Sequence, residues 1–495
     1  MFIHDLMYQG YDDALVAVDE DRRITYPAMR EEVAKYRNYL NDIGVKLGDR
    51  VGIFSRNSVD YIYAYFAIVS LGAIAVPINF QLSRREVAYI INDAGIKHLL
   101  TYQELDLADS LEKVGYKDQL IQHDIKTCYL EGSYPEAPEL PADFTEDKPC
   151  VIIYTSGTTG NPKGAVLSHK NIIANVKQVG KVVKCQRGYK VLCVLPMYHC
   201  FGWSLSVIYT MYCGATVVIL DSFTPKETIE TIRKENINDI YVVPPICALL
   251  TKLATKEDMQ TLRVVISGGT TLPLKIANDF YDKFGVNICE GYGLSEASPV
   301  VAVNHLNKVK VGSIGPALPD LEYRLVDGDN NDVPLGEAGE LIVKGDNVML
   351  GYWNLPEATA STLQDGWLHT GDVARSDEDG YLYIVDRIKD IIISMGENVY
   401  PREVEEVVYQ FPGIAEAAVV GVPDKLRGNA GACFFSVKEG ATVNVRELKK
   451  HLQDNLALYK IPREFHQMEA LPRTTTGKIA KNRIVEEFEK TAKSK

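Results

Sequence analysis

A regular alternation of short apolar runs with amphipathic segments, in the first third of the chain, constrains the fold more than any other feature. Residues 51–54, 73–78 and 98–101 are predicted strands, and residues 59–71 and 84–93 between them are predicted helices. Strands that alternate with helices pair in parallel, and the helices then cover both faces of the sheet. This part of the chain therefore predicts an α/β sheet.

The same alternation returns further along the chain and predicts a second α/β sheet. Its strands are expected at residues 191–195, 215–220, 240–243 and 264–266, with a helix at residues 224–236. Two sheets agree with the length, because a chain of 495 residues is too long for a single core.

Short runs separated by tight turns replace this alternation in the region from residue 312 to residue 386. Residues 322–326, 340–343 and 381–385 predict antiparallel strands of a barrel-like piece. The turn that starts at Asp327 begins like a calcium-binding loop, but Asp332 stands where that loop needs a glycine. A hairpin turn is predicted there instead.

The last part of the chain has a mixed, strongly charged composition that predicts a separate, smaller domain. Its helices are expected at residues 402–409 and 445–456, and its strands at residues 417–422 and 432–437. Both element types in one short segment predict an α+β arrangement.

The expected fold class is therefore α/β, in two domains. The large N-terminal domain, residues 1–386, would hold two α/β sheet subdomains and the barrel-like β subdomain. The small α+β C-terminal domain would cover residues 387–495.

Composition narrows the range of partners. The net charge of −13 opposes nucleic acid as a partner, because a polyanion must be met by a basic face. The nine cysteines include no C-x-x-C pair, which argues against zinc and is typical of reduced thiols. Two uncharged stretches, residues 61–79 and 191–220, contain glycine and proline and favour buried elements over membrane spans. With no evident signal peptide, we expect a soluble cytoplasmic protein, monomeric or homodimeric.

The string from Tyr154 to Gly164, Y-T-S-G-T-T-G-N-P-K-G, has the chemistry needed to hold phosphate oxygens. Its glycines let backbone N–H groups approach a ligand closely, its hydroxyls donate hydrogen bonds, and Lys163 adds a positive charge. The spacing fits neither a Walker A loop nor the dinucleotide fingerprint. Composition alone leaves an ordinary surface loop open as the alternative.

This string resembles the phosphate loop of the adenylate-forming enzymes, which include acyl-CoA synthetases, peptide-synthetase adenylation domains and firefly luciferase. The resemblance continues through G-Y-G-L-S-E at residues 291–296, W-L-H-T-G-D at 367–372, D-R-I-K-D at 386–390 and T-T-G-K at 475–478. It spans nearly the whole chain. One departure is Ser295, which stands where the family usually has threonine.

The resemblance implies how ATP would be bound. Thr155 and Glu296 would position Mg²⁺, Tyr292 would stack on the adenine, and Lys478 would bridge the substrate carboxylate and the α-phosphate. Asp372 would accept hydrogen bonds from the ribose diol. The other expected ATP contacts are Ser156, Gly157, Thr158, Thr159, Lys163, Gly268, Gly269, Gly291, Gly293, Ser295, Ile384 and Arg387.

The resemblance also implies sites for the acid and for coenzyme A. His199, Gly293 and Trp203 would line the acyl pocket, with His199 also expected to act in catalysis and Trp203 expected to gate the pocket in the manner of some fatty-acyl synthetases. A packed aromatic cluster remains the alternative for Trp203. Asp386 would be the hinge of a mobile C-terminal domain. The expected coenzyme A contacts are Lys389, Ser394, Gly396 and Glu397.

The implied activity is that of an AMP-forming acyl-CoA synthetase that uses ATP, Mg²⁺ and coenzyme A. The uncharged, aromatic-rich pocket segment predicts a fatty acid, with an aryl acid as the alternative. An acyl-AMP ligase that loads a carrier protein is a competitor, although no carrier segment follows Lys478. A catalytically silent nucleotide-binding protein and a luciferase-like oxygenase are further alternatives.

Overall fold

A computed structural model describes the chain except for residues 156–160, 395–396, 425–427, 474–478 and 494–495. The chain forms two compact units. The first contains Met1–Tyr323 and Val343–His369, and the second contains Arg324–Ile342 and Thr370–Lys495. The expected division into domains after Asp386 stays a prediction.

The first α/β sheet has seven strands in the order β17-β8-β7-β4-β3-β5-β6. Five of them run parallel, and β8 and β17 extend the sheet in antiparallel fashion. The bounds are β3 (Arg50–Phe54), β4 (Ile74–Pro77), β5 (His98–Thr101), β6 (Ile121–Asp124), β7 (Pro149–Thr155), β8 (Lys163–Ser168) and β17 (Gly351–Tyr352).

Helices α2 (Val59–Ser70) and α3 (Arg84–Ala94) connect the strands of this sheet, as the sequence predicted. Every residue of α2 is buried. A helix that is apolar on all sides must be surrounded by protein, which explains one of the two uncharged stretches. By contrast, α3 is amphipathic, and it begins at a Ser83–Glu86 capping box and ends at Gly95 in the left-handed conformation.

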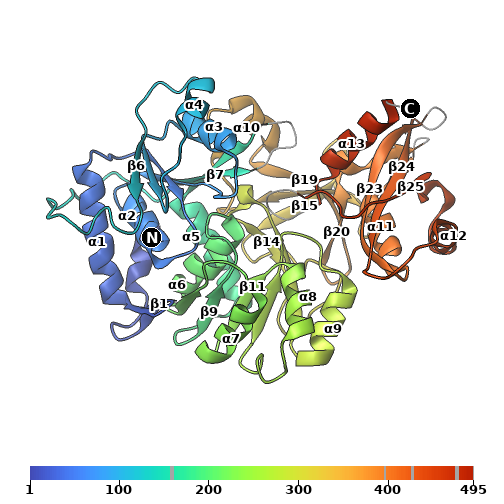
Figure 1. The fold of residues 1–495 in the computed structure, drawn as a ribbon, viewed down its shortest axis with the longest axis horizontal. Coiled ribbons are helices and arrows are strands. Elements are labelled where there is room, and N and C mark those ends of the chain that lie inside the picture. Colours follow the sequence, from blue (N-terminus) through green and yellow to red (C-terminus); the bar gives the residue numbers. More distant parts are fainter. Residues whose placement is uncertain (156–160, 395–396, 425–427, 474–478, 494–495) are drawn as a thin grey trace. The chain divides into compact units, whose positions relative to one another are not determined.

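The second sheet has eight strands in the order β14-β13-β12-β11-β9-β10-β1-β2. The bounds are β1 (Leu15–Asp19), β2 (Arg22–Thr25), β9 (Lys190–Cys193), β10 (Thr216–Ile219), β11 (Asp239–Val242), β12 (Val264–Ser267), β13 (Ile288–Gly293) and β14 (Val300–Val303). Helices α7 (Pro225–Glu235), α8 (Pro244–Leu253) and α9 (Leu274–Phe284) cover one face, where Ile232, Leu250 and Phe280 join the core (Figure 1). The hairpin β1–β2 comes from the start of the chain and was not predicted.

A five-stranded sheet confirms the predicted change of pattern after residue 312, and its β18–β19 and β19–β20 pairings are antiparallel. Its order is β15-β16-β19-β18, with β20 beside β19. The bounds are β15 (Glu322–Val326), β16 (Gly339–Lys344), β18 (Leu363–Gln364), β19 (Trp367–Ser376) and β20 (Leu382–Arg387). The Asp327 segment is a turn, because the Asp327 carboxylate accepts hydrogen bonds from the backbone N–H groups of Asp329 and Asn331.

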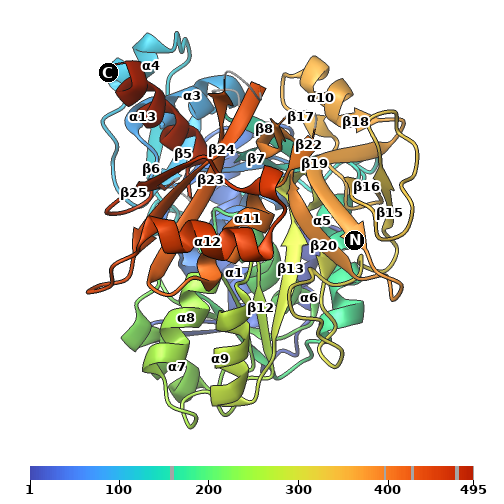
Figure 2. The same cartoon turned by 90° about the vertical axis from the view of Figure 1, so that its right-hand side faces the viewer.

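The C-terminal sheet has the order β22-β21-β24-β23, with β25 beside β24. Alternate residues of β23 face opposite sides, as in any strand. Val419 packs with α11 and α12, whereas Val420 packs with Ile484 of α13, so the helices cover both faces (Figure 2). The bounds are β21 (Ile392–Ser394), β22 (Glu397–Val399), α11 (Pro401–Gln410), β23 (Ile414–Asp424), β24 (Gly428–Val437), α12 (Val445–Asn455), β25 (Glu464–Gln467) and α13 (Lys481–Lys493).

The remaining helices are mostly short connections. They are η1 (Ile3–Tyr8), α1 (Tyr26–Asp42), α4 (Ala108–Lys113), α5 (His169–Val183), the π-helix η2 (Gly202–Tyr209), α6 (Thr210–Tyr212), η3 (Ser295–Ala297), α10 (Pro356–Thr362), η4 (Ile388–Asp390) and η5 (Leu458–Lys460). Among the described residues, no helix combines the length and the apolar character that a membrane span needs. All nine cysteines are free thiols.

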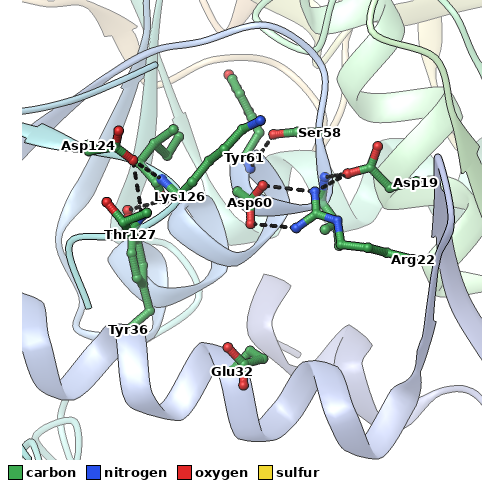
Figure 3. Close-up of polar contacts among 12 residues, drawn as sticks. Asp19, Arg22, Glu32, Tyr36, Ser58, Asp60, Tyr61, Asp124, Lys126 and Thr127 are labelled. Carbon is green, nitrogen blue, oxygen red and sulfur yellow. Dashed lines mark hydrogen bonds and ion pairs between the residues drawn. The ribbon is translucent and has the colours of Figure 1, made fainter. Parts of the chain in front are cut away.

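An ion cluster with two buried carboxylates and one half-exposed arginine ties the β1–β2 hairpin to α2 (Figure 3). The guanidinium of Arg22 donates two hydrogen bonds to the carboxylate of Asp60, at 3.0 and 2.9 Å, and also pairs with Asp19. Asp19 in turn accepts a hydrogen bond of 2.9 Å from the backbone N–H of Val59. Both carboxylates are buried, so one arginine neutralises two charges where the second sheet meets a helix of the first.

We expect Arg22→Ala to lower the free energy of unfolding by about 2 kcal/mol, because two buried carboxylates lose their cation while the half-exposed arginine limits the loss. Tryptophan fluorescence during urea unfolding measures this. Arg84→Ala is the control, since the ion pair of Arg84 with Asp106 is exposed on both sides and should contribute little. Equal, small losses in both variants would contradict a structural role for the cluster.

His169, at the start of α5, is a fully buried imidazole. Its Nδ1 accepts a hydrogen bond of 3.2 Å from the backbone N–H of Ile3, and the rings of Phe2 and Phe144 lie against it. Burial, assisted by nearby His4, lowers the pKa of His169 to about 3. The folded protein therefore keeps this side chain neutral at pH values where the unfolded chain protonates it.

Stability should fall as the pH drops below the ordinary histidine pKa of about 6.5, because only the unfolded chain then takes up this proton. Between pH 7 and pH 5, His169 should account for about 2 kcal/mol of that loss. Urea unfolding of wild type and His169→Gln at both pH values tests this. The variant should be less sensitive to pH by that amount, and an identical pH dependence in the two proteins would disprove the assignment.

Candidate active site

The predicted phosphate loop is the connection of a β-hairpin between β7 and β8. Thr155 pairs with Lys163 in the antiparallel register, and its hydroxyl donates to the Lys163 carbonyl at 3.4 Å. The pairing brings the first and last polar residues of the string together. Ser156, Gly157, Thr158 and Thr159 lie outside the described residues, so their roles stay predictions.

Gly164 and Tyr154 show why the hairpin ends as it does. A side chain at Gly164 would come within 2.6 Å of Ile152, so only glycine fits at this position of β8. The hydroxyl of Tyr154 donates to the carboxylate of Asp93 at 2.5 Å, and burial together with Asp93 raises the pKa of Tyr154. The base of the loop is therefore fixed by packing on one side and by a neutral phenol on the other.

The second predicted segment emerges where β13 ends, beside the end of β12. Gly268, which follows β12, lies so close to Gly291 that a side chain at Gly268 would be 3.3 Å from the Gly291 carbonyl oxygen. Gly293 is more strongly restricted, because a side chain there would meet the Pro299 carbonyl oxygen at 2.1 Å. The structure thus brings the two predicted glycine segments together at the carboxyl edge of the sheet, where open α/β folds bind ligands.

Glu296 lies in η3 and contacts a residue that the sequence interpretation did not consider. The hydroxyl of Tyr352 donates a hydrogen bond of 2.7 Å to Oε1 of Glu296. The ammonium group of Lys163 lies 5.1 Å from the centre of the same Tyr352 ring. Tyr352 therefore contacts one expected Mg²⁺ ligand and one expected phosphate ligand.

The expected Mg²⁺ ligands suit the ion chemically. Glu296 offers a carboxylate and Thr155 a hydroxyl, and Mg²⁺ prefers a few oxygen ligands from protein together with substrate phosphates and water. Helix η3, which contains Glu296, packs against β8, the strand that pairs with Thr155. The residues fit the ion, and their role as its ligands stays a prediction.

The segment around His199, which is expected to line the acyl pocket, is partly buried, and its side chains are tightly connected. Nδ1 of His199 accepts a hydrogen bond of 3.2 Å from the backbone N–H of Phe201, and Sγ of Cys200 lies 3.3 Å from Oγ of Ser295. The ring of Phe201 packs on Gly268, at 3.3 Å from where a side chain would begin. The aromatic ring of Phe201 therefore lies against Gly268, one of the expected ATP residues.

Trp203 is buried, and its ring lies 4.4 Å from the ring of Tyr65 and 5.3 Å from that of Tyr61, measured between ring centres. This is the packed aromatic cluster that the sequence left open as the alternative to a gate. Gating by Trp203 stays a prediction.

Asn57 is a second residue that sequence interpretation missed. Its side-chain amide donates to the carbonyl oxygens of Leu195 and Leu220, each at 3.0 Å, and its oxygen accepts from the backbone N–H of Met197 at 2.7 Å. One buried amide thus fixes the backbone just before His199. An asparagine after a strand usually indicates a turn, so the sequence carried no signal for this role.

In the second unit, the expected ribose ligand Asp372 forms an ion pair with the expected ATP contact Arg387. Nε of Arg387 lies 3.0 Å from Oδ1 of Asp372, and the two residues are register partners on β20 and β19. Asp372 is buried, and its backbone N–H donates to the hydroxyl of Thr370 at 3.1 Å. The structure therefore brings Asp372 and Arg387 together, whereas Ile384 faces Ala374 two positions further along the hairpin.

The expected hinge residue, Asp386, is also buried. Its carboxylate accepts hydrogen bonds from the backbone N–H groups of Arg387 at 2.8 Å and Arg402 at 2.9 Å. Burial raises the pKa of Asp386, and the nearby cation of Lys481 opposes this. Burial likewise lowers the pKa of Lys389, an expected coenzyme A contact.

The other expected coenzyme A residues lie on the hairpin β21–β22. Ser394 is buried and pairs with Glu397, which is exposed. Gly396 lies outside the described residues, as does Lys478, the expected catalytic lysine. Their positions stay predictions.

Comparison with known proteins decides the family. The family model described as AMP-binding enzyme matches residues 7–353, and the model for the AMP-binding enzyme C-terminal domain matches residues 403–478. The chain belongs to the AMP-binding enzyme family. The predicted superfamily, fold class and enzyme class are thereby confirmed.

Relatives of this AMP-binding enzyme include two ligases with different named acids. A feruloyl-CoA synthase from Amycolatopsis sp is 35% identical over 469 residues, which cover 94% of each chain. A long-chain-fatty-acid–CoA ligase from Bacillus subtilis (strain 168) is 33% identical over 506 residues, covering 94% of this chain and 90% of the relative.

A solved structure of the same architecture is the o-succinylbenzoate coenzyme A synthetase from Bacillus subtilis, in complex with ATP and magnesium ion. It superimposes with a TM-score of 0.88 at 28% identity and covers 98% of this chain and 99% of its own. The AMP-binding enzyme described here thus has the fold of an adenylate-forming ligase along nearly its whole length.

Proposed function

We propose that this enzyme joins a monocarboxylic acid with an apolar tail to coenzyme A, using ATP and releasing AMP and pyrophosphate. One observation carries the acid class: the segment from residue 191 to residue 220 has no acidic or basic side chain other than His199. Leu195, Met197 and Trp203 within it are buried. A second carboxylate or an ammonium group on the substrate would lose its hydration there without gaining a partner.

The first half-reaction forms the acyl-adenylate. An oxygen of the substrate carboxylate attacks the α-phosphorus of ATP, the bond to the β-phosphate oxygen breaks, and pyrophosphate leaves. Lys163 and Thr155 hold the phosphates, and Lys478 offsets the charge that develops between the carboxylate and the α-phosphate. Mg²⁺, when held by Glu296 and Thr155, neutralises phosphate charge.

The second half-reaction transfers the acyl group to the thiol. The sulfur of coenzyme A attacks the acyl carbon, the bond to the phosphate oxygen breaks, and AMP leaves. The C-terminal domain turns about Asp386 between the two steps, so that Lys389 and Gly396 approach the thiol in place of Lys478. No residue of the chain forms a covalent bond to the substrate.

A fatty acid is the first candidate for the apolar acid, as the sequence predicts, and an aryl acid is the second. The Phe201 ring on Gly268 supports the aryl acid, because a flat aromatic wall suits a planar substrate. Both candidates have a named relative. Trp203 distinguishes them: a long chain needs the space that the cluster with Tyr61 and Tyr65 fills, whereas an aryl acid does not.

Pyrophosphate release with matched pairs of acids tests the acid class. Octanoate should exceed suberate, and 3-phenylpropanoate should exceed phenylalanine, each by about 100-fold in kcat/KM, because the extra charge would be buried unpaired. Trp203→Ala should raise the activity with palmitate relative to cinnamate if a fatty acid is the substrate. Equal rates within each matched pair would contradict the apolar site.

Lys478→Ala should lose adenylate formation, and Lys389→Ala should lose thioester formation. Each variant is therefore a control for the other. Lys478→Ala should slow adenylate formation by about 100-fold or more, since it removes a preorganised charge, yet it should form thioester from supplied acyl-adenylate at the wild-type rate. Lys389→Ala should do the reverse. Pyrophosphate exchange and loss of free coenzyme A thiol measure the two steps.

An exposed lysine, Lys438→Ala, should change neither step. If both lysine variants lose both half-reactions equally, the two-conformation account is wrong. If thiol is consumed only when a carrier protein replaces coenzyme A, the competing carrier-loading function is correct.

A further inference from the structure

We propose that Tyr352 is a positioning residue for adenylate formation: its hydroxyl fixes the Glu296 carboxylate, and its ring fixes the Lys163 ammonium group. This inference rests on the proposed function, which assigns Glu296 to Mg²⁺ and Lys163 to the phosphates of ATP.

Two contacts of one side chain carry the inference. The Tyr352 hydroxyl donates to Oε1 of Glu296 at 2.7 Å, and the Lys163 ammonium group lies 5.1 Å from the ring centre. A carboxylate oxygen can only accept in this bond, so the phenol serves Glu296 as a hydrogen-bond donor.

The backbone around Tyr352 is tied to both segments that it serves. The N–H of Trp353 donates to the Gly164 carbonyl at 2.7 Å, and the N–H of Met349 donates to the Glu296 carbonyl at 2.9 Å. Between these two bonds, Tyr352 pairs with Ala165 in the antiparallel register of β17 and β8. The ring is thus placed by backbone pairing with the strand that ends the phosphate loop.

A third connection fixes Tyr352 from the other side. Its backbone N–H donates to the hydroxyl of Thr359 at 2.9 Å. Gly351 before it has a φ of +144°, and a side chain there would meet Thr359 at 2.7 Å. Residue 351 must therefore be glycine for Thr359 to reach this backbone.

The chemistry of a metal ligand explains what the hydroxyl contributes. A carboxylate has two oxygens, and a donor on Oε1 sets its rotation and leaves Oε2 to face a cation. Partners that orient metal ligands in this way typically change metal affinity by about 10-fold to 100-fold when they are removed. The ring adds a smaller contribution, because the attraction of an ammonium group to an aromatic face at a partly exposed site corresponds to about 3-fold in affinity.

Tyr352→Phe tests the hydroxyl alone, since the ring remains. Isothermal titration calorimetry with Mg·ATP should show binding weakened by about 10-fold. The Mg²⁺ concentration for half-maximal pyrophosphate exchange should rise by about the same factor. Thioester formation from supplied acyl-adenylate should stay at the wild-type rate.

Tyr129→Phe is the matched control. It also removes a tyrosine–glutamate hydrogen bond, from Tyr129 to Glu32 at 2.9 Å, and this bond joins Tyr129 to α1 rather than to a described residue of the expected ATP site. Tyr129→Phe should leave Mg·ATP affinity unchanged, and its thermal midpoint should fall at least as far as that of Tyr352→Phe. Tyr352→Leu removes the ring as well and should weaken Mg·ATP binding by about a further 3-fold.

Unchanged Mg·ATP affinity in Tyr352→Phe would overturn the inference, as would an equal loss of both half-reactions together with a lowered thermal midpoint. The proposed function fails separately, if wild type exchanges no pyrophosphate with any acid of the matched pairs. In that case calorimetry of Mg·ATP binding still decides the role of Tyr352.

Discussion

The pairing of β8 with strands on both of its sides is the constraint on which the large unit depends. On one side, β7 closes the phosphate loop through the Thr155–Lys163 pair. On the other side, the short strand β17 pairs through Gly351 and Tyr352. Because side chains in a sheet follow from the register, a shift of one residue on either side would turn the polar groups away from the site. Two pairings in one sheet therefore set much of the expected ATP geometry.

Each of the two compact units contains some of the expected ATP contacts and fixes their positions. In the large unit, Glu296 and Lys163 meet at Tyr352. In the small unit, Asp372 and Arg387 meet as register partners. The Arg387 guanidinium holds the Asp372 carboxylate in one orientation, because a charge-assisted hydrogen bond is short and directional. Each of these pairs is therefore held within a single unit.

Most of the fold followed from the sequence because local periodicity decides strands and helices. The helix of residues 84–93, the strand of residues 98–101 and the change of pattern after residue 312 all appear where periodicity placed them. The β1–β2 hairpin could not be assigned to the second sheet, because its partner β10 lies some 200 residues further on, as the Ala17–Val217 pair shows. Long-range pairing has no local signature.

From the sequence, residues of the candidate site could be proposed only where the residue types in a string indicate a particular chemistry. Glycines and hydroxyls in one dense string predicted a loop that holds phosphate, and the resemblance to a family implied the individual ATP residues, whose roles stay predictions. Tyr352 and Asn57 act through contacts with distant segments, and in sequence they look like an aromatic in a short strand and a turn asparagine. Trp203 shows the opposite limit, since its spacing from His199 fits a gate and its surroundings form a packed cluster. Only the neighbours of a side chain in the folded structure distinguish a residue that gates a pocket from one that packs in a cluster.

The way Asn57 holds the backbone before His199 has a consequence for how this enzyme could acquire new substrates. Its three hydrogen bonds reach only main-chain atoms, so they do not depend on which side chains follow. Neighbouring side chains such as Cys200 and Phe201 can therefore be exchanged while the course of the chain is kept. Because this frame does not depend on the side chains that it supports, a combinatorial library confined to those positions should yield folded variants in which only the proposed acid site is changed.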